Sequence, residues 1–214
     1  MLGPDTGDDR NERPMNGKDT GTIRAMLQRE TRAAHQDMHN APLFLALLDG
    51  RIGMPAYVTL LQNLLAVHRC AEQSVAPFED HPLLAWRVKY PTPKRSVLLQ
   101  ADILLLDAAA HLPVAAEEAI VPRTAFAALG WAWVVEGSQL GARVLAKRVE
   151  AMLGQDWSRS GGSFFAPAAA EAPRWKACCA ALETATGDNL ARDDLREGAL
   201  GMFDVFFRHL GSGG

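Results

Sequence analysis

The apolar positions of this chain recur mainly at the spacing of α-helices. An amphipathic helix is predicted from about Thr22, a suitable N-cap, to Met38, and a short helix with an early proline follows from Pro42 to Gly50. Further helical patterns cover roughly 54–75, 94–110, 124–153, 172–186 and 190–210, separated by glycine- and proline-rich segments. No segment gives a convincing strand pattern. We therefore predict an all-α, single-domain bundle of about seven helices.

The two ends of the chain lack this periodicity. Residues 1–21 are rich in Gly, Pro, Asp, Asn and Arg, and residues 211–214 read GSGG. We expect a disordered arm over 1–21, a folded domain over 22–210 and a flexible tail over 211–214. The arm has no apolar core that could act as a signal peptide, and no stretch approaches the ~20 apolar residues of a membrane span. These features predict a cytoplasmic protein without a membrane association.

Composition narrows the function classes. The chain has 214 residues, 48% of them hydrophobic, which is enough for one real core. Its formal net charge of -3 gives no electrostatic reason to expect a nucleic-acid partner. The cysteines are Cys70, Cys178 and Cys179; an odd number with two adjacent predicts buried thiols rather than a disulfide framework.

The predicted helix over 124–153 is unusual because three glycines interrupt it. Gly130, Gly137 and Gly141 each cost ~1 kcal/mol relative to alanine inside a helix, so their presence needs a reason. Gly137 and Gly141 are four residues apart and therefore share a face. One interpretation is close contact with another helix. The other is that a flat or bulky ligand lies against bare backbone, and the pattern alone leaves both open.

His35 lies at the edge of the apolar stripe of the first predicted helix, two turns after Leu27. A histidine there can be a packed core residue or a ligand. His39 follows at i+4, a spacing that can bind zinc, but there is no H-E-x-x-H pattern and no obvious third ligand. His68 continues another apolar face, so we expect it in the core.

Three segments, in this order along the chain, resemble the bacterial-type, biliverdin-producing heme oxygenases. Residues 31–35 (TRAAH), preceded by Leu27, resemble the proximal helix, which shows an L-R-x-x-T-x-x-x-H pattern. Residues 133–143 (WVVEGSQLGAR) resemble the distal helix, commonly Y-V-L-E-G-S-x-L-G-G-R. Residues 164–167 (FFAP) with the aromatic segments after them resemble a third family segment. The resemblance covers roughly residues 22–210.

The resemblance implies an enzyme that uses heme b as both cofactor and substrate. His35 would be the axial ligand of the iron, with Thr31 in the same binding segment, and Gly137, Ser138 and Gly141 would cover the opposite, catalytic face. With O2, the products would be biliverdin, carbon monoxide and ferrous iron. Electrons would come from a ferredoxin or a flavoprotein reductase, because the chain has no flavin or nicotinamide fingerprint. The biliverdin could supply a phytochrome, or the reaction could serve iron acquisition.

The heme propionates need cationic partners, for which Lys176 and Arg29 are the first candidates and Arg143 and Lys147 the alternatives. Two positions depart from the family pattern. Trp133 stands where many bacterial relatives have tyrosine, and Ala142 replaces the second glycine of a pair, which would add a methyl group near the distal face. These departures favour an alternative function, a heme carrier or sensor that does not degrade heme. A third hypothesis is a helical scaffold that binds no heme.

Overall fold

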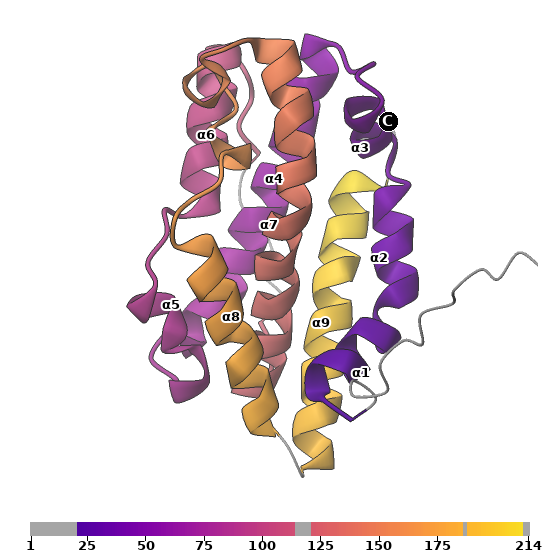
Figure 1. Ribbon diagram of the computed structural model, residues 1–214, viewed down its shortest axis with the longest axis vertical. Helices are drawn as coiled ribbons and strands as arrows, with labels where there is room; N and C mark the ends of the chain where they lie inside the picture. The colour runs from indigo at the N-terminus through magenta and orange to yellow at the C-terminus, as the bar shows by residue number, and fades with distance from the viewer. Residues whose placement is uncertain (1–20, 114–120, 186–187, 212–214) are drawn as a thin grey trace, which may run out of the picture.

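The computed structural model describes residues 21–113, 121–185 and 188–211, and these ranges form a bundle of helices without strands (Figure 1). The all-α prediction is confirmed. The predicted arm and tail fall almost entirely on residues 1–20 and 212–214, outside the described ranges. The α-helices are α1 (Ile23–Glu30), α2 (Arg32–His39), α3 (Pro42–Leu48), α4 (Met54–Val75), α5 (Trp86–Lys89), α6 (Arg95–Leu106), α7 (Ala125–Leu153), α8 (Glu171–Leu182) and α9 (Asn189–Leu210).

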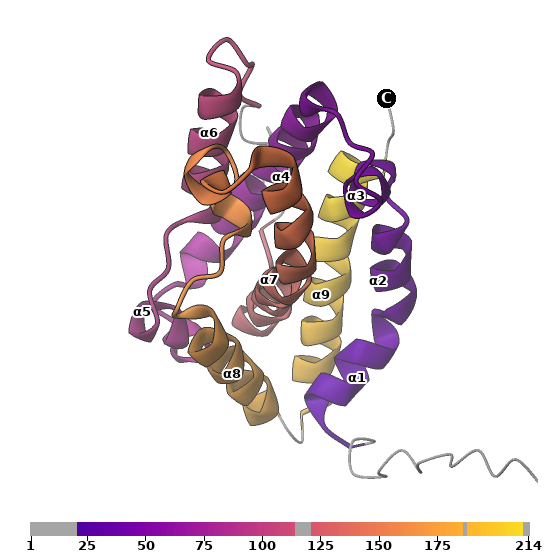
Figure 2. The same ribbon diagram turned by 45° about the horizontal axis from the view of Figure 1, so that its top comes forward.

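The first predicted helix is in fact two helices, so its predicted continuity is wrong. Thr22 caps α1 as expected, because its hydroxyl accepts a hydrogen bond from the backbone N–H of Ala25 at 3.1 Å. The break comes at buried Thr31, whose hydroxyl donates to the carbonyl oxygen of Leu27 at 2.8 Å. This return bond to the previous turn tends to bend helices. The bend turns α2, which carries His35, away from the direction of α1 (Figure 2).

Helices α7 and α9 pack closely, and α9 lies between α7 and α2 in both views (Figures 1 and 2). Two glycines make the α7–α9 approach possible. A Cβ atom on Gly130 would lie 2.1 Å from the carbonyl oxygen of Leu195, and one on Gly198 would lie 2.0 Å from that of Ala127. Both distances are impossible, so the backbones meet at these positions only because each helix has glycine there.

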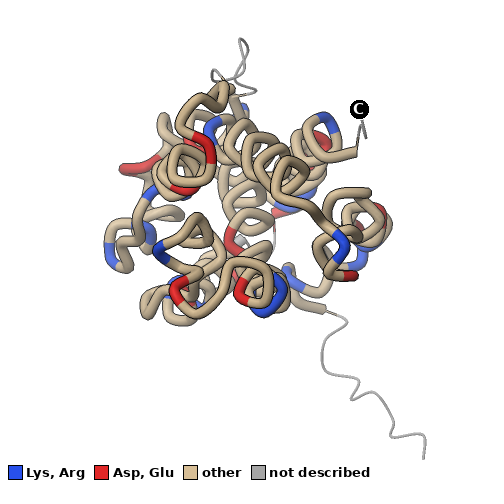
Figure 3. The backbone as a smooth tube through the Cα atoms, turned by 90° about the horizontal axis from the view of Figure 1, so that it is seen from above, with Lys and Arg blue, Asp and Glu red and all other residues tan. Residues whose placement is uncertain are grey.

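Other predicted boundaries shift where local polar groups compete with the helix. Helix α6 ends at Leu106 rather than near residue 110, because the Asp107 side chain accepts a hydrogen bond from the N–H of Ala109 at 3.0 Å and forms a turn. The short α5, which the pattern did not predict, precedes the proline-rich segment. Charged residues of both signs occur around the outline of the bundle (Figure 3). No helix in the described ranges combines the length and apolar character needed to cross a bilayer.

Candidate functional site

His35 lies on the exposed side of α2 and is available to a ligand. Its ring centroid is 4.6 Å from that of His39 and 6.3 Å from that of Phe203 on α9, edge to face in both cases. The surrounding protein removes part of its hydration and lowers the pKa of His35, and the charge that His39 can carry acts in the same direction. A lowered pKa favours the neutral imidazole, the form that binds metals.

The three glycines of α7 have different surroundings, which answers the question that the pattern left open. Gly130 is a helix-contact glycine, as described above. Gly141 is exposed, and among the described residues no heavy atom outside its own stretch of helix lies within 4 Å of the point where its Cβ would lie. Its neighbours Leu140 and Val144 are 41% and 62% exposed. This turn of α7 therefore presents bare backbone and apolar side chains to open space.

Gly137, one turn earlier, meets Trp175 of α8. A Cβ atom on Gly137 would lie 3.4 Å from the indole carbon Cη2, which is ordinary contact distance. The indole of Trp175 also stacks on Trp133, with centroids 6.3 Å apart, and the guanidinium of Arg24 lies 6.0 Å from its centroid. Trp175 thus connects the glycine side of α7 with α1.

Ser138 and Ala142 each follow one of these two glycines: Ser138 is half-buried like Gly137, whereas Ala142 is buried beside exposed Gly141. The Ser138 hydroxyl donates to the carbonyl of Val135 at 2.7 Å and accepts from the amide of Gln139 at 3.4 Å. Ala142 is buried in the hydrophobic core. Its methyl group therefore belongs to the core and not to the exposed surface at Gly141.

The predicted cationic and threonine contacts are dispersed. Arg29 is exposed and pairs with its neighbour Glu30 at 3.0 Å, whereas Lys176, which follows Trp175 in the chain, is exposed. Arg143 approaches Glu171 at 3.8 Å. The Thr31 hydroxyl is committed to the helix bend. Of these residues, Lys176 is the one next to a side chain that contacts the glycine face.

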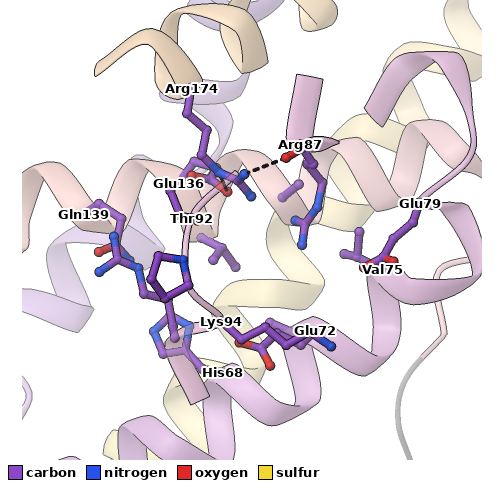
Figure 4. A pocket seen from close by; sticks show the side chains of 15 residues that line it. His68, Glu72, Val75, Glu79, Arg87, Thr92, Lys94, Glu136, Gln139 and Arg174 are labelled. Atoms are coloured by element: carbon purple, nitrogen blue, oxygen red, sulfur yellow. Dashed lines mark hydrogen bonds and ion pairs between the residues drawn. The ribbon is translucent and has the colours of Figure 1, made fainter. Parts of the chain in front are cut away.

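The opposite side of α7 borders a polar cavity of about 70 Å³ (Figure 4). At about 100° per residue, Gln139 and Glu136 lie well away from the Gly137 face of the helix. His68, predicted to be a core residue, is buried and lines this cavity, and burial lowers its pKa to about 3. The Oε1 atom of Gln139 is buried and has no partner among the described residues.

A buried ion pair lines this cavity. The guanidinium of Arg174 on α8 donates to the Glu136 carboxylate of α7 at 2.8 Å and to the carbonyl oxygen of Arg87 at 3.1 Å (Figure 4). It also donates to the carbonyl oxygen of Tyr90 at 2.7 Å. Both ionised side chains are nearly fully buried. The sequence motifs did not predict this pair. The one sign of it in the sequence is Glu136, a charged residue that follows an apolar stretch of α7 and therefore needs a buried partner.

The donor set suits heme better than a free metal ion. Within the described ranges no group of three His, Cys, Asp or Glu side chains could hold a metal ion, so the His35–His39 pair lacks a third ligand there. The exposed imidazole on α2 suits one axial iron ligand, and the bare backbone and apolar side chains on α7 suit contact with a flat apolar ring. A β-carbon at position 141 would occupy part of the open space beside the α7 backbone, which glycine leaves free.

Comparison with known proteins supports this interpretation of the fold. No match is found among curated protein sequences. The structure is similar to heme oxygenase-1 of Synechocystis solved with heme (TM-score 0.68, 18% identity, 89% of this chain and 91% of that chain). It is also similar to the heme oxygenase of Leptospira interrogans (TM-score 0.72, 12% identity, 88% of this chain and 98% of that chain). A third similar structure is the heme oxygenase of Neisseria meningitidis (TM-score 0.64, 21% identity, 89% of this chain and 92% of that chain). The family model for heme oxygenase matches residues 22–211, so this chain belongs to the heme oxygenase family.

Proposed function

We propose that this chain is a heme oxygenase that opens heme b to biliverdin, releasing carbon monoxide and ferrous iron at the expense of O2 and external electrons. The observation that carries the proposal is the open turn at Gly141, on a helix whose motif matches the family. A second support is the exposed, neutral-favouring imidazole of His35 on α2. The similar Synechocystis protein was solved with heme.

The proposed roles follow from the surroundings of each residue. His35 would hold the iron through its neutral imidazole, while buried Phe203 packs against the ring edge and limits its rotation. Gly137 and Gly141 would let the α7 backbone lie close to the opposite face. Ser138 would keep the helix polar there without a free hydroxyl proton, since that proton is donated to Val135. When bound, heme supplies both the iron at which O2 reacts and the ring that is cleaved.

Lys176 would pair with a propionate, because its charge is exposed beside Trp175. Arg29 would contribute less, because its guanidinium already pairs with Glu30. A ferredoxin or flavoprotein reductase would supply the electrons. A phytochrome that accepts the biliverdin is one possible destination of the product, and iron release from heme is the other use of the reaction.

The first test is the substitution His35→Ala. We expect loss of the wild-type axial ligation in the heme spectrum and loss of most biliverdin formation, because the imidazole is the only iron ligand proposed. His39→Ala is the matched control, one turn away on the same exposed face, and should retain both. A wild-type spectrum in His35→Ala together with a changed one in His39→Ala would transfer the ligand assignment to His39.

A second candidate is a heme carrier or sensor on the same fold. It is favoured by Trp133, a buried residue whose indole N–H has no partner among the described residues, at a position where a hydroxyl could organise water. The wild-type protein with heme, a reducing system and catalase separates the two functions. Formation of biliverdin supports the enzyme, whereas a stable heme spectrum without a biliverdin band supports the carrier.

A further inference from the structure

Trp175 on α8 lies between the glycine face of α7 and helix α1. One part of its indole contacts Gly137 and the stacked ring of Trp133 on α7. Arg24 of α1 lies 6.0 Å from the ring centroid, at the limit of a cation–π contact. The half-buried indole therefore covers the α7 backbone at Gly137. The next turn of α7, at Gly141, is left open.

Helix α8 holds this indole on a rigid support. The neighbouring Arg174 is held by the buried pair with Glu136 (Figure 4). The carbonyl oxygens of Arg87 and Tyr90 also accept hydrogen bonds from it. Beyond the end of α8, the Glu183 carboxylate accepts hydrogen bonds from the N–H groups of Ile23 and Arg24, each at 3.1 Å. These bonds satisfy free donors at the start of α1 and tie it to the α8 end. Trp175 is thus anchored at both ends of its helix.

We infer that Trp175 is a specificity-determining residue: it forms the end wall of the heme site and sets the in-plane orientation of the ring. This inference rests on the proposed function. Heme b has a nearly square outline, so rotation about the axial bond changes which meso carbon lies under α7 without changing the ligand of the iron. A rigid indole at one end favours the orientation whose edge fits it, and the orientation in turn selects the carbon that is cleaved.

The test compares Trp175→Ala, Trp175→Phe and wild type. Proton NMR of the ferric heme–cyanide complex counts in-plane orientations through the heme methyl signals, without any turnover. For Trp175→Ala we expect a second set of methyl signals, and a minor biliverdin isomer that increases about fivefold or more by chromatography. Trp175→Phe, which keeps a flat ring, should return both readouts toward wild type. Trp157→Ala, a tryptophan substitution outside the contacts with Gly137, should change neither.

Unchanged methyl signals and an unchanged isomer ratio in a folded Trp175→Ala protein overturn the inference. If that variant does not fold, Trp175→Leu replaces it, because leucine retains apolar contact but has no flat ring, and the same second orientation is expected. If wild type binds heme without forming biliverdin, the proposed enzymatic function is wrong. The methyl signals still show whether Trp175 sets the orientation of the ring. If wild type shows no shifted Soret band, both proposals fall, and the missing band identifies heme binding as the cause.

Discussion

Gly130 and Gly141 are the same residue type on the same helix, and their surroundings are opposite. A Cβ atom on Gly130 would collide with the Leu195 carbonyl, whereas one on Gly141 would meet nothing within 4 Å. Both glycines carry the same cost of ~1 kcal/mol in helix propensity. At Gly130 that cost is offset by close packing of α7 on α9. At Gly141 no protein contact offsets it, which is expected where a ligand uses the space.

The largest predicted effect tests the packed half of this comparison. Gly130→Ala should lower the free energy of unfolding by about 3 kcal/mol, because α7 and α9 must separate to admit the methyl group. Urea denaturation measures the loss. Gly201→Ala on α9 is the matched control: nothing lies within 4 Å of its Cβ position, so it should gain roughly 0.5–1 kcal/mol. Equal stability of wild type and Gly130→Ala would show that the two backbones do not meet there.

The pattern of apolar residues predicted most of the fold, because long amphipathic helices such as α4, α7 and α9 bury one continuous face. It failed at Thr31, where a single side-chain bond divides a helix whose apolar spacing is continuous. For the site, the motifs identified the helices that carry His35 and Gly141. The glycine spacing alone could not distinguish Gly130 from Gly141, because the backbone that Gly130 meets is that of Leu195, 65 residues away and in no recognised motif.

The polar cavity on the other side of α7 was also beyond prediction from sequence. It forms because residues from α4, α7 and α8 converge, and none of its ionised pairs is local in sequence. His68 illustrates the difficulty: its apolar spacing correctly predicted burial, but its polar surroundings depend on Gln139 and Arg174 from other helices. Contacts of this kind depend on how helices pack, which spacing within one helix does not encode.

The next largest effect concerns His68, which lines the polar cavity on the opposite side of α7 from Gly141. It tests whether protons reach this buried side of the helix in the folded protein. The pKa of His68 is about 3 in the folded protein and near 6.5 when unfolded, so only the unfolded chain binds its proton between these values. Its contribution to stability is full above pH 6.5 and is lost as the pH falls toward 3. We expect a loss of about 2 kcal/mol between pH 7 and pH 5.

Urea denaturation at pH 7, 6 and 5 measures this loss in wild type and in His68→Gln, which has no titrating ring. The difference between the two isolates His68 from the other histidines. His81→Gln, at an exposed loop position, should retain the wild-type slope. A wild-type slope in His68→Gln would mean that the ring is accessible to protons in the folded protein, and that this side of α7 is as open as Gly141.

The smallest predicted change in stability is that of Gly141→Ala, which tests whether the open space at Gly141 is used by a ligand. Gly141→Ala should raise the free energy of unfolding by roughly 0.5–1 kcal/mol, because the helix gains a better former and the methyl group meets no neighbour. The same methyl group should weaken heme binding about tenfold, since it enters space that the proposed ligand uses. Opposite signs in denaturation and heme titration are the signature of a glycine retained for a ligand, because a packing glycine such as Gly130 loses stability when substituted. A gain in stability with unchanged heme affinity would show that heme does not lie against Gly141, and would leave Gly137, beside Trp175, as the point where α7 approaches the ring.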